Sequence, residues 1–277
     1  MLGESPIWSS AESVLYWVDI HKPSILRADL AEGSVTEWPL PENVGSIGFR
    51  PDGLVASLRL GFALFDTATG AVKRLAQPLA GRHNIRFNDG RVDRAGRFWA
   101  GTVHEKRERG TAALYRLDPD GSCREMATGF TVSNGISWSP DNRTMYFADS
   151  QDRAVYAFDF DLADGAIANR RLFARFSEGE GIPDGATVDV DGAYWVAHFD
   201  GGKITRYAPD GRVDRTIPMP VPRPTSCAFG GPGLKTLYVT SASFGLSPEQ
   251  RASAPLSGSV FALDVGTQGL PEPVFRG

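Results

Sequence analysis

The segment RFNDGRVDRAGRFWAGT, residues 86–102, contains the unit from which the fold is predicted. Asn88-Asp89-Gly90 near its start is typical of a turn, yet the residues that follow, Arg91-Val92-Asp93, alternate as in a strand. A true turn, Arg94-Ala-Gly-Arg, comes next and leads into the apolar strand Phe98-Trp99-Ala100. The segment therefore predicts two short strands, the first of which begins with polar side chains.

The same turn followed by an apolar strand recurs along the chain. Six copies occur, and the other five lie at residues 10–18, 51–56, 140–148, 190–196 and 231–239. Most copies continue with a third strand that ends in an acid, as in ALYRLD at residues 113–118, and then with a fourth strand. Short strands repeated at a period of roughly 40 to 50 residues, without a long helical period, are typical of a β-propeller. The sequence predicts an all-β fold, a six-bladed β-propeller with four-stranded blades around a central channel, as a single domain over residues 1–277. The aromatic residues of the second strands are expected to pack between blades.

Composition and charge narrow the classes of partner and compartment. The chain has 277 residues, 42% hydrophobic and 22% charged, and its formal net charge of −4 gives no reason to expect nucleic acid or an anionic membrane as a partner. No apolar run approaches the roughly 20 residues of a membrane-spanning helix, and the start MLGESPIW lacks the features of a secretion signal. The two cysteines, Cys123 and Cys227, lack the spacing of a zinc site and are expected to be buried free thiols. These features predict a cytoplasmic protein, and because a propeller with closed edges has no strong need of a partner, we expect a monomer or a weak homodimer.

When the six repeats are aligned on their turns, one residue of each repeat lies at the start of its innermost strand. The inner strands of a propeller surround the channel, so six such residues are predicted to form a ring around one point. The equivalent positions are Glu4, Gly45, Asn88, Asn134, Asp184 and Ser226. Subtraction of their residue numbers gives separations of 41, 43, 46, 50 and 42 residues. Four of them carry carboxylate or amide oxygens that could bind a metal, namely Glu4, Asn88, Asn134 and Asp184.

A simpler interpretation is that these polar residues only form turns. Asn88-Asp89-Gly90, Asn134-Gly135 and Asp184-Gly185 all match common turn sequences. However, the chain before each of them crosses between blades, the hairpin turn comes later in each repeat, and Glu4 has no turn residue beside it. A ligand-binding or catalytic ring is therefore favoured over solvated loop residues.

The ring predicts a metal site. Two carboxylates that converge on a channel repel each other unless a cation lies between them, and oxygen donors suit hard cations such as Ca²⁺, Mg²⁺ or Mn²⁺. Three or four protein ligands leave positions for water and substrate, as metal-assisted hydrolysis requires. Arg86 lies two residues before Asn88, so in an extended segment both side chains point the same way. Arg86 is therefore a candidate for binding a hydroxyl-rich or anionic substrate, with a structural ion pair as the alternative.

Other candidates for the site are less specific. His104 and His198 follow second strands and are candidates for the channel wall. The run HEKRERG, residues 104–110, is expected to be a solvated loop, with a lid over the channel mouth as the alternative. No Gly-x-Ser-x-Gly elbow occurs, so the sequence supports no serine nucleophile. No phosphate-binding glycine loop occurs either.

Five motifs together resemble those of the senescence-marker protein / gluconolactonase / regucalcin family of sugar lactonases. The motifs are GESPIW from Gly3, RFNDG from Arg86, SNG from Ser133, IPDG from Ile182 and TSCAFGG from Thr225, and the resemblance extends over nearly the whole chain. It implies a six-bladed propeller with one divalent metal in the channel. It further implies metal ligation by Glu4, Asn134 and Asp184 and substrate binding by Arg86, Asn88 and the lid residue Glu108.

One difference from the family concerns the closure of the ring. Relatives usually carry a strand before the Gly-Glu motif, whereas this chain begins almost at the motif. We therefore expect residues 273–276, PVFR, to form the outer strand of blade six on their own, with a truncated start as the alternative.

The function that the resemblance implies is a metal-dependent sugar lactonase, a carboxylic-ester hydrolase that converts a gluconolactone-, xylonolactone- or arabinonolactone-like aldonolactone to its aldonic acid. One divalent ion is expected, Ca²⁺ first, with Mn, Fe, Zn or Mg as alternatives. Asp184 is the candidate catalytic residue: either it accepts the proton of the attacking water, or it orients that water while the metal lowers the pKa of the water. Two other functions fit the same scaffold, a calcium-binding regulatory propeller of the regucalcin type and a phosphotriesterase-like hydrolase.

Overall fold

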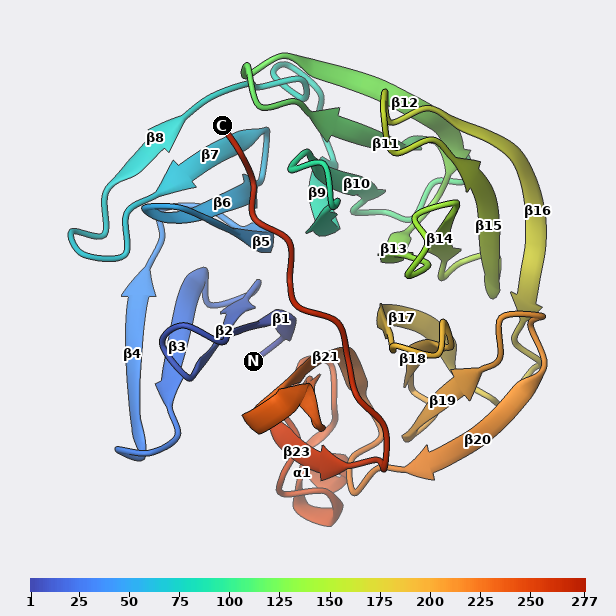
Figure 1. Ribbon diagram of the computed structural model, residues 1–277. Coiled ribbons are helices and arrows are strands. Elements are labelled where there is room, and N and C mark those ends of the chain that lie inside the picture. The colour runs from blue at the N-terminus through green and yellow to red at the C-terminus, as the bar shows by residue number, and fades with distance from the viewer.

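Six antiparallel sheets surround a central channel in the computed structural model, which describes residues 1–277 (Figure 1). Within each sheet the strands follow chain order, and the first strand of each blade lies next to the channel. The predicted six-bladed β-propeller is therefore confirmed. Because each inner strand begins at the same end of the channel, residues at equivalent positions of the repeat come together there.

The strands of each blade are short, as the repeat predicts. Blades one to three comprise β1 (Gly3–Ser9), β2 (Val14–Asp19), β3 (Ser24–Asp29) and β4 (Ser34–Pro39); β5 (Val44–Arg50), β6 (Gly53–Leu58), β7 (Phe62–Phe65) and β8 (Val72–Arg74); and β9 (Ile85–Val92), β10 (Phe98–His104), β11 (Ala112–Leu117) and β12 (Cys123–Phe130). Blades four to six comprise β13 (Ser133–Trp138), β14 (Thr144–Asp149), β15 (Ala154–Phe160) and β16 (Ile167–Arg175); β17 (Ile182–Val188), β18 (Tyr194–Phe199), β19 (Lys203–Tyr207) and β20 (Val213–Pro218); and β21 (Pro224–Gly230), β22 (Thr236–Ser241) and β23 (Phe261–Asp264).

Two short helices lie within blade six. The 3-10 helix η1 (Pro232–Leu234) precedes β22, and the α-helix α1 (Pro248–Ser253) lies between β22 and β23. Helix α1 begins with a capping box, in which the hydroxyl of Ser247 accepts a hydrogen bond from the backbone N–H of Gln250. Neither helix has the length and hydrophobicity that crossing a membrane requires.

Blade six has three strands, and the expectation that residues 273–276 supply its fourth strand is wrong. These residues belong to a segment, residues 269–277, that we call the C-terminal strap. The strap leaves blade six and crosses the end of the channel toward blades two and three (Figure 1). The backbone N–H of Phe275 donates to the carbonyl of Phe49 in β5 at 2.7 Å, and the N–H of Arg276 donates to the carbonyl of Gly96 at 3.1 Å. The fully buried ring of Phe275 packs in the hydrophobic cluster formed by blades two and three.

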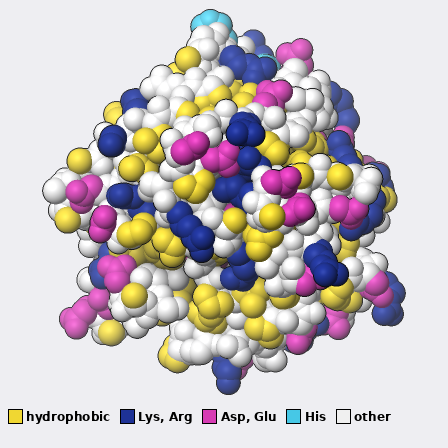
Figure 2. Space-filling view, turned by 45° about the horizontal axis from the view of Figure 1, so that its top comes forward, with side chains coloured by type: hydrophobic (Ala, Val, Ile, Leu, Met, Phe, Trp, Pro, Cys, Tyr) yellow, Lys and Arg dark blue, Asp and Glu magenta, His cyan; other side chains and the backbone are white.

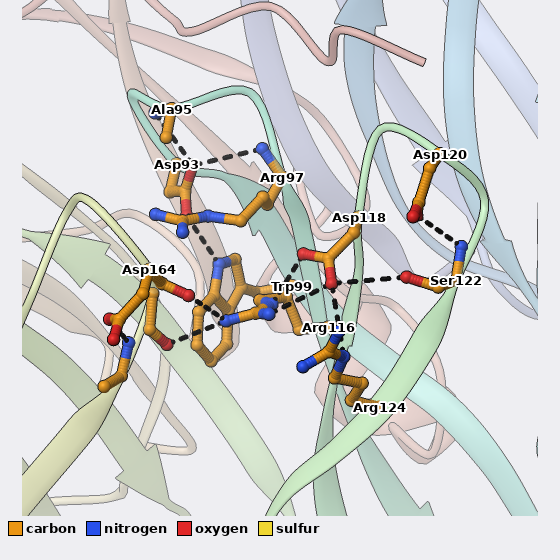
Figure 3. Close-up of polar contacts among 12 residues, drawn as sticks. Asp93, Ala95, Arg97, Trp99, Arg116, Asp118, Asp120, Ser122, Arg124 and Asp164 are labelled. Atoms are coloured by element: carbon orange, nitrogen blue, oxygen red, sulfur yellow. Dashed lines mark hydrogen bonds and ion pairs between the residues drawn. The ribbon is translucent and has the colours of Figure 1, made fainter.

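Aromatic residues of the second strands pack between blades, as predicted, and two of the tryptophans are also held by buried acids. In blade three, Oδ2 of Asp93 accepts hydrogen bonds from Nε1 of Trp99 at 2.9 Å and from Nε of Arg97 at 2.7 Å (Figure 3). Blade five repeats the arrangement, with Nε1 of Trp195 donating to Asp189 at 2.8 Å. Each indole therefore has its polar atom satisfied while its ring fills the space between blades. Both cysteines are free, as predicted, but only Cys227 is buried, since Cys123 is partly exposed.

Every inner strand contains a β-bulge close to its predicted ring position. The pairing register between first and second strands shifts between Glu4 and Ile7 in blade one and between Asn134 and Ser137 in blade four, and similar shifts occur in the other four blades. A bulge bends a strand and redirects a side chain. Gly135, directly after Asn134, has a φ of 60°, a conformation that glycine adopts readily. The bulges therefore let the ring residues leave the regular alternation of the sheet.

The outer surface carries charges of both signs. Acidic and basic side chains are intermixed on the face shown in Figure 2. Some form ion pairs between neighbouring strands, as Arg171 does with Asp159 at 2.6 Å. Exposed pairs of this kind contribute about 0 to 1 kcal/mol each, so the fold depends mainly on the packing between blades.

Candidate metal centre and substrate channel

A cavity of about 540 Å³ opens at the end of the channel where the inner strands begin, opposite the C-terminal strap. Its wall contains the four ring residues that carry carboxylate or amide groups, together with Arg86; the ring residues are Glu4, Asn88, Asn134 and Asp184. Gly45 is absent from the wall. A Cβ at this position would lie 2.3 Å from the backbone oxygen of Asn88, so glycine is what allows β5 and β9 to approach this closely. The structure thus brings the predicted polar residues together in one cavity.

The two ring carboxylates are buried without a cationic partner. The relative exposure of Glu4 is 8% and that of Asp184 is 6%, and neither side chain forms an ion pair. Burial raises the pKa of Glu4 well above its ordinary value, and the charge of Asp184 raises this pKa further. Burial likewise raises the pKa of Asp184, with the charge of Asp89 as the second cause. The two carboxylates therefore need either protons or a cation.

A divalent cation fits this donor set. Two carboxylates and the amide oxygen of Asn134 are the oxygen ligands that hard cations prefer. The structure contains no group of three or more His, Cys, Asp and Glu side chains arranged to hold a metal, so a cation here depends on these two acids and one amide. Such a small ligand set leaves coordination positions for water or substrate.

A chain of hydrogen bonds fixes the amides of the ring. Nδ2 of Asn88 donates to Oδ1 of Asn134 at 2.9 Å, and Nδ2 of Asn134 donates to Oγ of Ser150 at 2.8 Å. The Ser150 hydroxyl in turn donates to the backbone carbonyl of Pro183 at 2.6 Å. Because a backbone carbonyl can only accept, the direction of every bond in this chain is determined. The chain links blades three, four and five, and it ends beside Asp184.

Arg86 starts this chain of hydrogen bonds. Its Nη1 donates to Oδ1 of Asn88 and to the backbone carbonyl of Phe87, both at 2.9 Å. The predicted common direction of the Arg86 and Asn88 side chains is therefore confirmed. Burial lowers the pKa of Arg86 to about 10, so the guanidinium stays charged near neutral pH. Asn88 uses both amide protons within the protein, on Asn134 and on the carbonyl of Ser133, so its direct effect is to orient its neighbours.

The rim of the cavity is formed by loops and aromatic rings. His21 stacks on Phe244 with ring centroids 3.9 Å apart, and both residues lie in the wall. The loop between β10 and β11, residues 105–111, borders the mouth and contributes Glu105 and Arg107 to the wall. The predicted solvated loop thus lies where the alternative interpretation places a lid.

The remaining predicted residues occupy different places. His104 lies in the cavity wall, whereas His198 is buried outside it, stacked on Phe176 at 4.2 Å. The Glu108 side chain is 68% exposed, is not part of the wall, and lies 3.6 Å from Nε2 of His104. The structure therefore brings Glu4, Asn88, Asn134, Asp184, Arg86 and His104 together and leaves Glu108 outside the group.

Three residues of the site carry no clear signal in the sequence. Ser150 follows the end of β14 and resembles any polar residue after a strand. Asp89 follows Asn88 and reads as part of a turn, yet it is a third carboxylate near the cavity, whose Oδ2 accepts from the backbone N–H of Ile136 at 3.1 Å. Arg107 lies in a run of charges that gives no reason to single it out.

Known proteins with similar sequences cover the whole chain. Residues 2–243 match the family model described as SMP-30/Gluconolactonase/LRE-like region. The chain is 44% identical over 279 residues to a protein of Pseudomonas putida named 6-deoxy-6-sulfogluconolactonase, with 100% of this chain and 96% of that protein covered. It is 39% identical over 284 residues to a protein of Gallus gallus named Regucalcin, with 100% of this chain and 95% of that protein covered.

Solved structures agree with the sequence comparison. A structure described as a calcium-binding protein, regucalcin, from Agrobacterium tumefaciens superimposes with a TM-score of 0.96 at 29% sequence identity, and covers 100% of this chain and 94% of that one. Fold, motifs and family model all point to the same group of proteins. The chain therefore belongs to the SMP-30/gluconolactonase/LRE-like family.

Proposed function

We propose that the protein is a metal-dependent sugar lactonase that hydrolyses an aldonolactone to its aldonic acid. The observation that carries the proposal is the buried pair Glu4 and Asp184, which lies with Asn134 in a cavity bordered by Arg86. Only six of the 17 residues in the wall are hydrophobic, which suits a polyhydroxylated lactone better than an apolar phosphotriester. The 44% identical relative is named for a gluconolactone, so gluconolactones head the candidate substrates.

Hydrolysis of a lactone breaks the bond between the acyl carbon and the ring oxygen. Water supplies a hydroxyl to the acyl carbon and a proton to the ring oxygen, and the acid then ionises and releases a proton near neutral pH. A divalent cation held by Glu4, Asn134 and Asp184, Ca²⁺ first among the candidates, would polarise the carbonyl and stabilise the negative charge that develops on its oxygen.

The side chains of the cavity have distinct roles in this proposal. Arg86 has guanidinium N–H groups beyond the bonds to Phe87 and Asn88, and these can hold hydroxyl or ring oxygens of the sugar. Asn88 and Ser150 keep the amide of Asn134 oriented. Asp184 either accepts the proton of the attacking water or holds that water in place while the proton passes to solvent.

Proton release by metal-stripped protein tests the proposal. A panel of aldonolactones is added before and after Ca²⁺, Mn²⁺, Fe²⁺, Zn²⁺ or Mg²⁺ is restored, one metal at a time. We expect acid production above the spontaneous rate only after a metal is restored. Asp184→Ala should lose turnover and metal binding together, whereas Asp210→Asn, an exposed acid in blade five, should behave as wild type. Full activity of Asp184→Ala would refute the assignment.

A calcium-binding regulatory role is the second candidate. It is favoured by the relative named Regucalcin and by the similar structure described as a calcium-binding protein. Tight Ca²⁺ binding without hydrolysis of any lactone in the panel would favour this role over the enzyme.

A further inference from the structure

The loop between β10 and β11 is anchored on both sides of the cavity mouth. Glu105 at its start forms an ion pair with Arg59 of blade two at 2.6 Å. Arg109 near its end pairs with Asp152 of blade four at 3.1 Å. Between these anchors the backbone turns tightly, because the N–H of Arg107 donates to the carbonyl of His104 at 2.7 Å. The loop therefore has a defined course over the mouth.

Arg107 is the last residue of this turn. Its φ is +53°, a left-handed conformation that is uncommon for a residue with a side chain. Its side chain lies in the cavity wall, and it forms neither an ion pair nor a side-chain hydrogen bond. Its neighbour Lys106 also lacks a partner but does not contribute to the wall. Among the cations of the loop, only Arg107 both lacks an acidic partner and lines the cavity.

The charges around the cavity leave Arg107 available for a ligand. Glu105, the acid that shares the rim, already has Arg59 as its partner. Arg107 lines the same cavity as Asp184 and Arg86, so its positive charge contributes to the electrostatic field inside the cavity. Arg86 is bound to Asn88 and Phe87 at the ring, while Arg107 is exposed at the rim. The cavity thus has two cations, Arg86 at the ring residues and Arg107 at the rim.

We infer that Arg107 binds an anionic substituent of the substrate, so that the preferred lactone carries a sulfonate, phosphate or carboxylate group at the end remote from its ester. The inference rests on the proposed lactonase function and assigns a specificity residue to it. A planar guanidinium with free donors recognises all three kinds of oxyanion through charge-assisted hydrogen bonds. With the lactone carbonyl among the ring residues, the rest of the sugar extends toward the rim, where Arg107 lies.

Steady-state kinetics with a charged and a neutral lactone tests the inference. The substrates are 6-phosphogluconolactone, the corresponding sulfonate, and gluconolactone, and the proteins are metal-loaded wild type, Arg107→Gln and the matched control Lys106→Gln. Loss of one charge-assisted hydrogen bond should lower kcat/KM for the anionic lactones roughly 10- to 100-fold, mainly through KM. Turnover of neutral gluconolactone by Arg107→Gln, and turnover of all substrates by Lys106→Gln, should stay within about twofold.

The same kinetic measurements identify which anionic group of the substrate Arg107 binds. A stronger effect of Arg107→Gln on the sulfonate than on the phosphate would assign the site to sulfonated sugars, and the reverse to phosphorylated ones. Equal kcat/KM of wild type on charged and neutral lactones, or equal losses of both in Arg107→Gln, would overturn the inference.

A binding measurement separates this inference from the proposed function. The product 6-phosphogluconate is titrated into wild type and Arg107→Gln by calorimetry, which requires no turnover. Binding that is weakened by Arg107→Gln, in a protein that hydrolyses no lactone, would support the anion site and refute the lactonase. Hydrolysis of gluconolactone together with product binding that is indifferent to Arg107→Gln would do the opposite.

Discussion

Asn88 donates a hydrogen bond from Nδ2 to Oδ1 of Asn134 at 2.9 Å, across the boundary between blades three and four. An amide carbonyl has two lone pairs, so this bond leaves one lone pair of Asn134 for a cation in the cavity. The orientation of the proposed metal ligand is therefore set by a neighbouring blade as well as by its own strand. Substitutions that disturb the orientation should affect the metal before they affect the fold.

Ser150→Ala should weaken metal binding. The substitution removes the hydroxyl that accepts from Nδ2 of Asn134, so the amide loses the partner that fixes its direction. Loss of such an outer partner typically lowers metal affinity by about 10- to 100-fold. Calorimetric titration with Ca²⁺ measures the effect. Ser137→Ala removes an equally buried hydroxyl at the other end of blade four and should leave the affinity unchanged. Equal affinities for the two variants would contradict the prediction.

Arg86→Lys should reduce turnover although it keeps the charge. In Arg86 one nitrogen, Nη1, donates both bonds, to Asn88 and to the carbonyl of Phe87, so Nε and Nη2 remain for the substrate, whereas lysine has a single nitrogen for all of these roles. We expect kcat/KM for gluconolactone to fall roughly 10- to 100-fold at saturating metal. Arg91→Lys, on the same strand but at the strap end, serves as the control and should retain wild-type kinetics. Retention of full activity by Arg86→Lys would remove Arg86 from the substrate site.

His198 should contribute stability that is lost in mild acid. Burial lowers the pKa of His198 to about 4 from the ordinary 6.5, so the folded state binds a proton less readily than the unfolded state. The stabilising contribution is complete above about pH 6.5 and is lost as the pH falls toward 4, which amounts to about 2 kcal/mol by pH 5. Urea unfolding of wild type and His198→Gln at pH 7.5 and pH 5 isolates this loss, because the other titrating groups are common to both proteins. The loss should be smaller in His198→Gln, and identical losses in both proteins would argue against the assignment.

Phe275→Ala should destabilise the fold from the last residues of the chain. The side chain is 1% exposed within the cluster of blades two and three, and truncation of a buried phenylalanine costs about 3 to 5 kcal/mol. Val274→Ala, at a position that is 43% exposed, should change the free energy of unfolding by less than about 0.5 kcal/mol. Chemical denaturation distinguishes the two. A small effect of Phe275→Ala would mean that the strap adds little to the packing of the blades.

The sequence was sufficient to predict the blades and the residues that meet in the channel. The repeat spacing places Glu4 and Asp184 at equivalent positions although they are far apart in the chain, and both lie in one cavity. The β-bulges beside these residues could not be predicted, because a register shift depends on how two strands pair rather than on either strand alone. The role of Ser150 was hidden for a similar reason, since its partners Asn134 and Pro183 belong to different blades.

The sequence was least informative about segments that could pack against more than one blade. The expectation that residues 273–276 complete blade six is wrong, because an apolar residue such as Phe275 can fill a gap in any blade. His104 and His198 occupy similar places after second strands, yet only His104 lies in the cavity wall. The chain that leads into blade five covers His198 and accepts its Nδ1–H at the carbonyl of Glu180, 2.8 Å away. Whether a neighbouring segment buries a histidine depends on tertiary packing, which the pattern of residues along a strand does not predict.

The C-terminal strap and the cavity lie at opposite ends of the channel. The strap crosses the end that faces away from the ring residues and is bonded to blades two and three, while blade five contacts the same segment through Asp189 and Gly269 (Figure 1). A ligand that enters at the open end therefore passes Arg107 before it reaches Glu4 and Asp184.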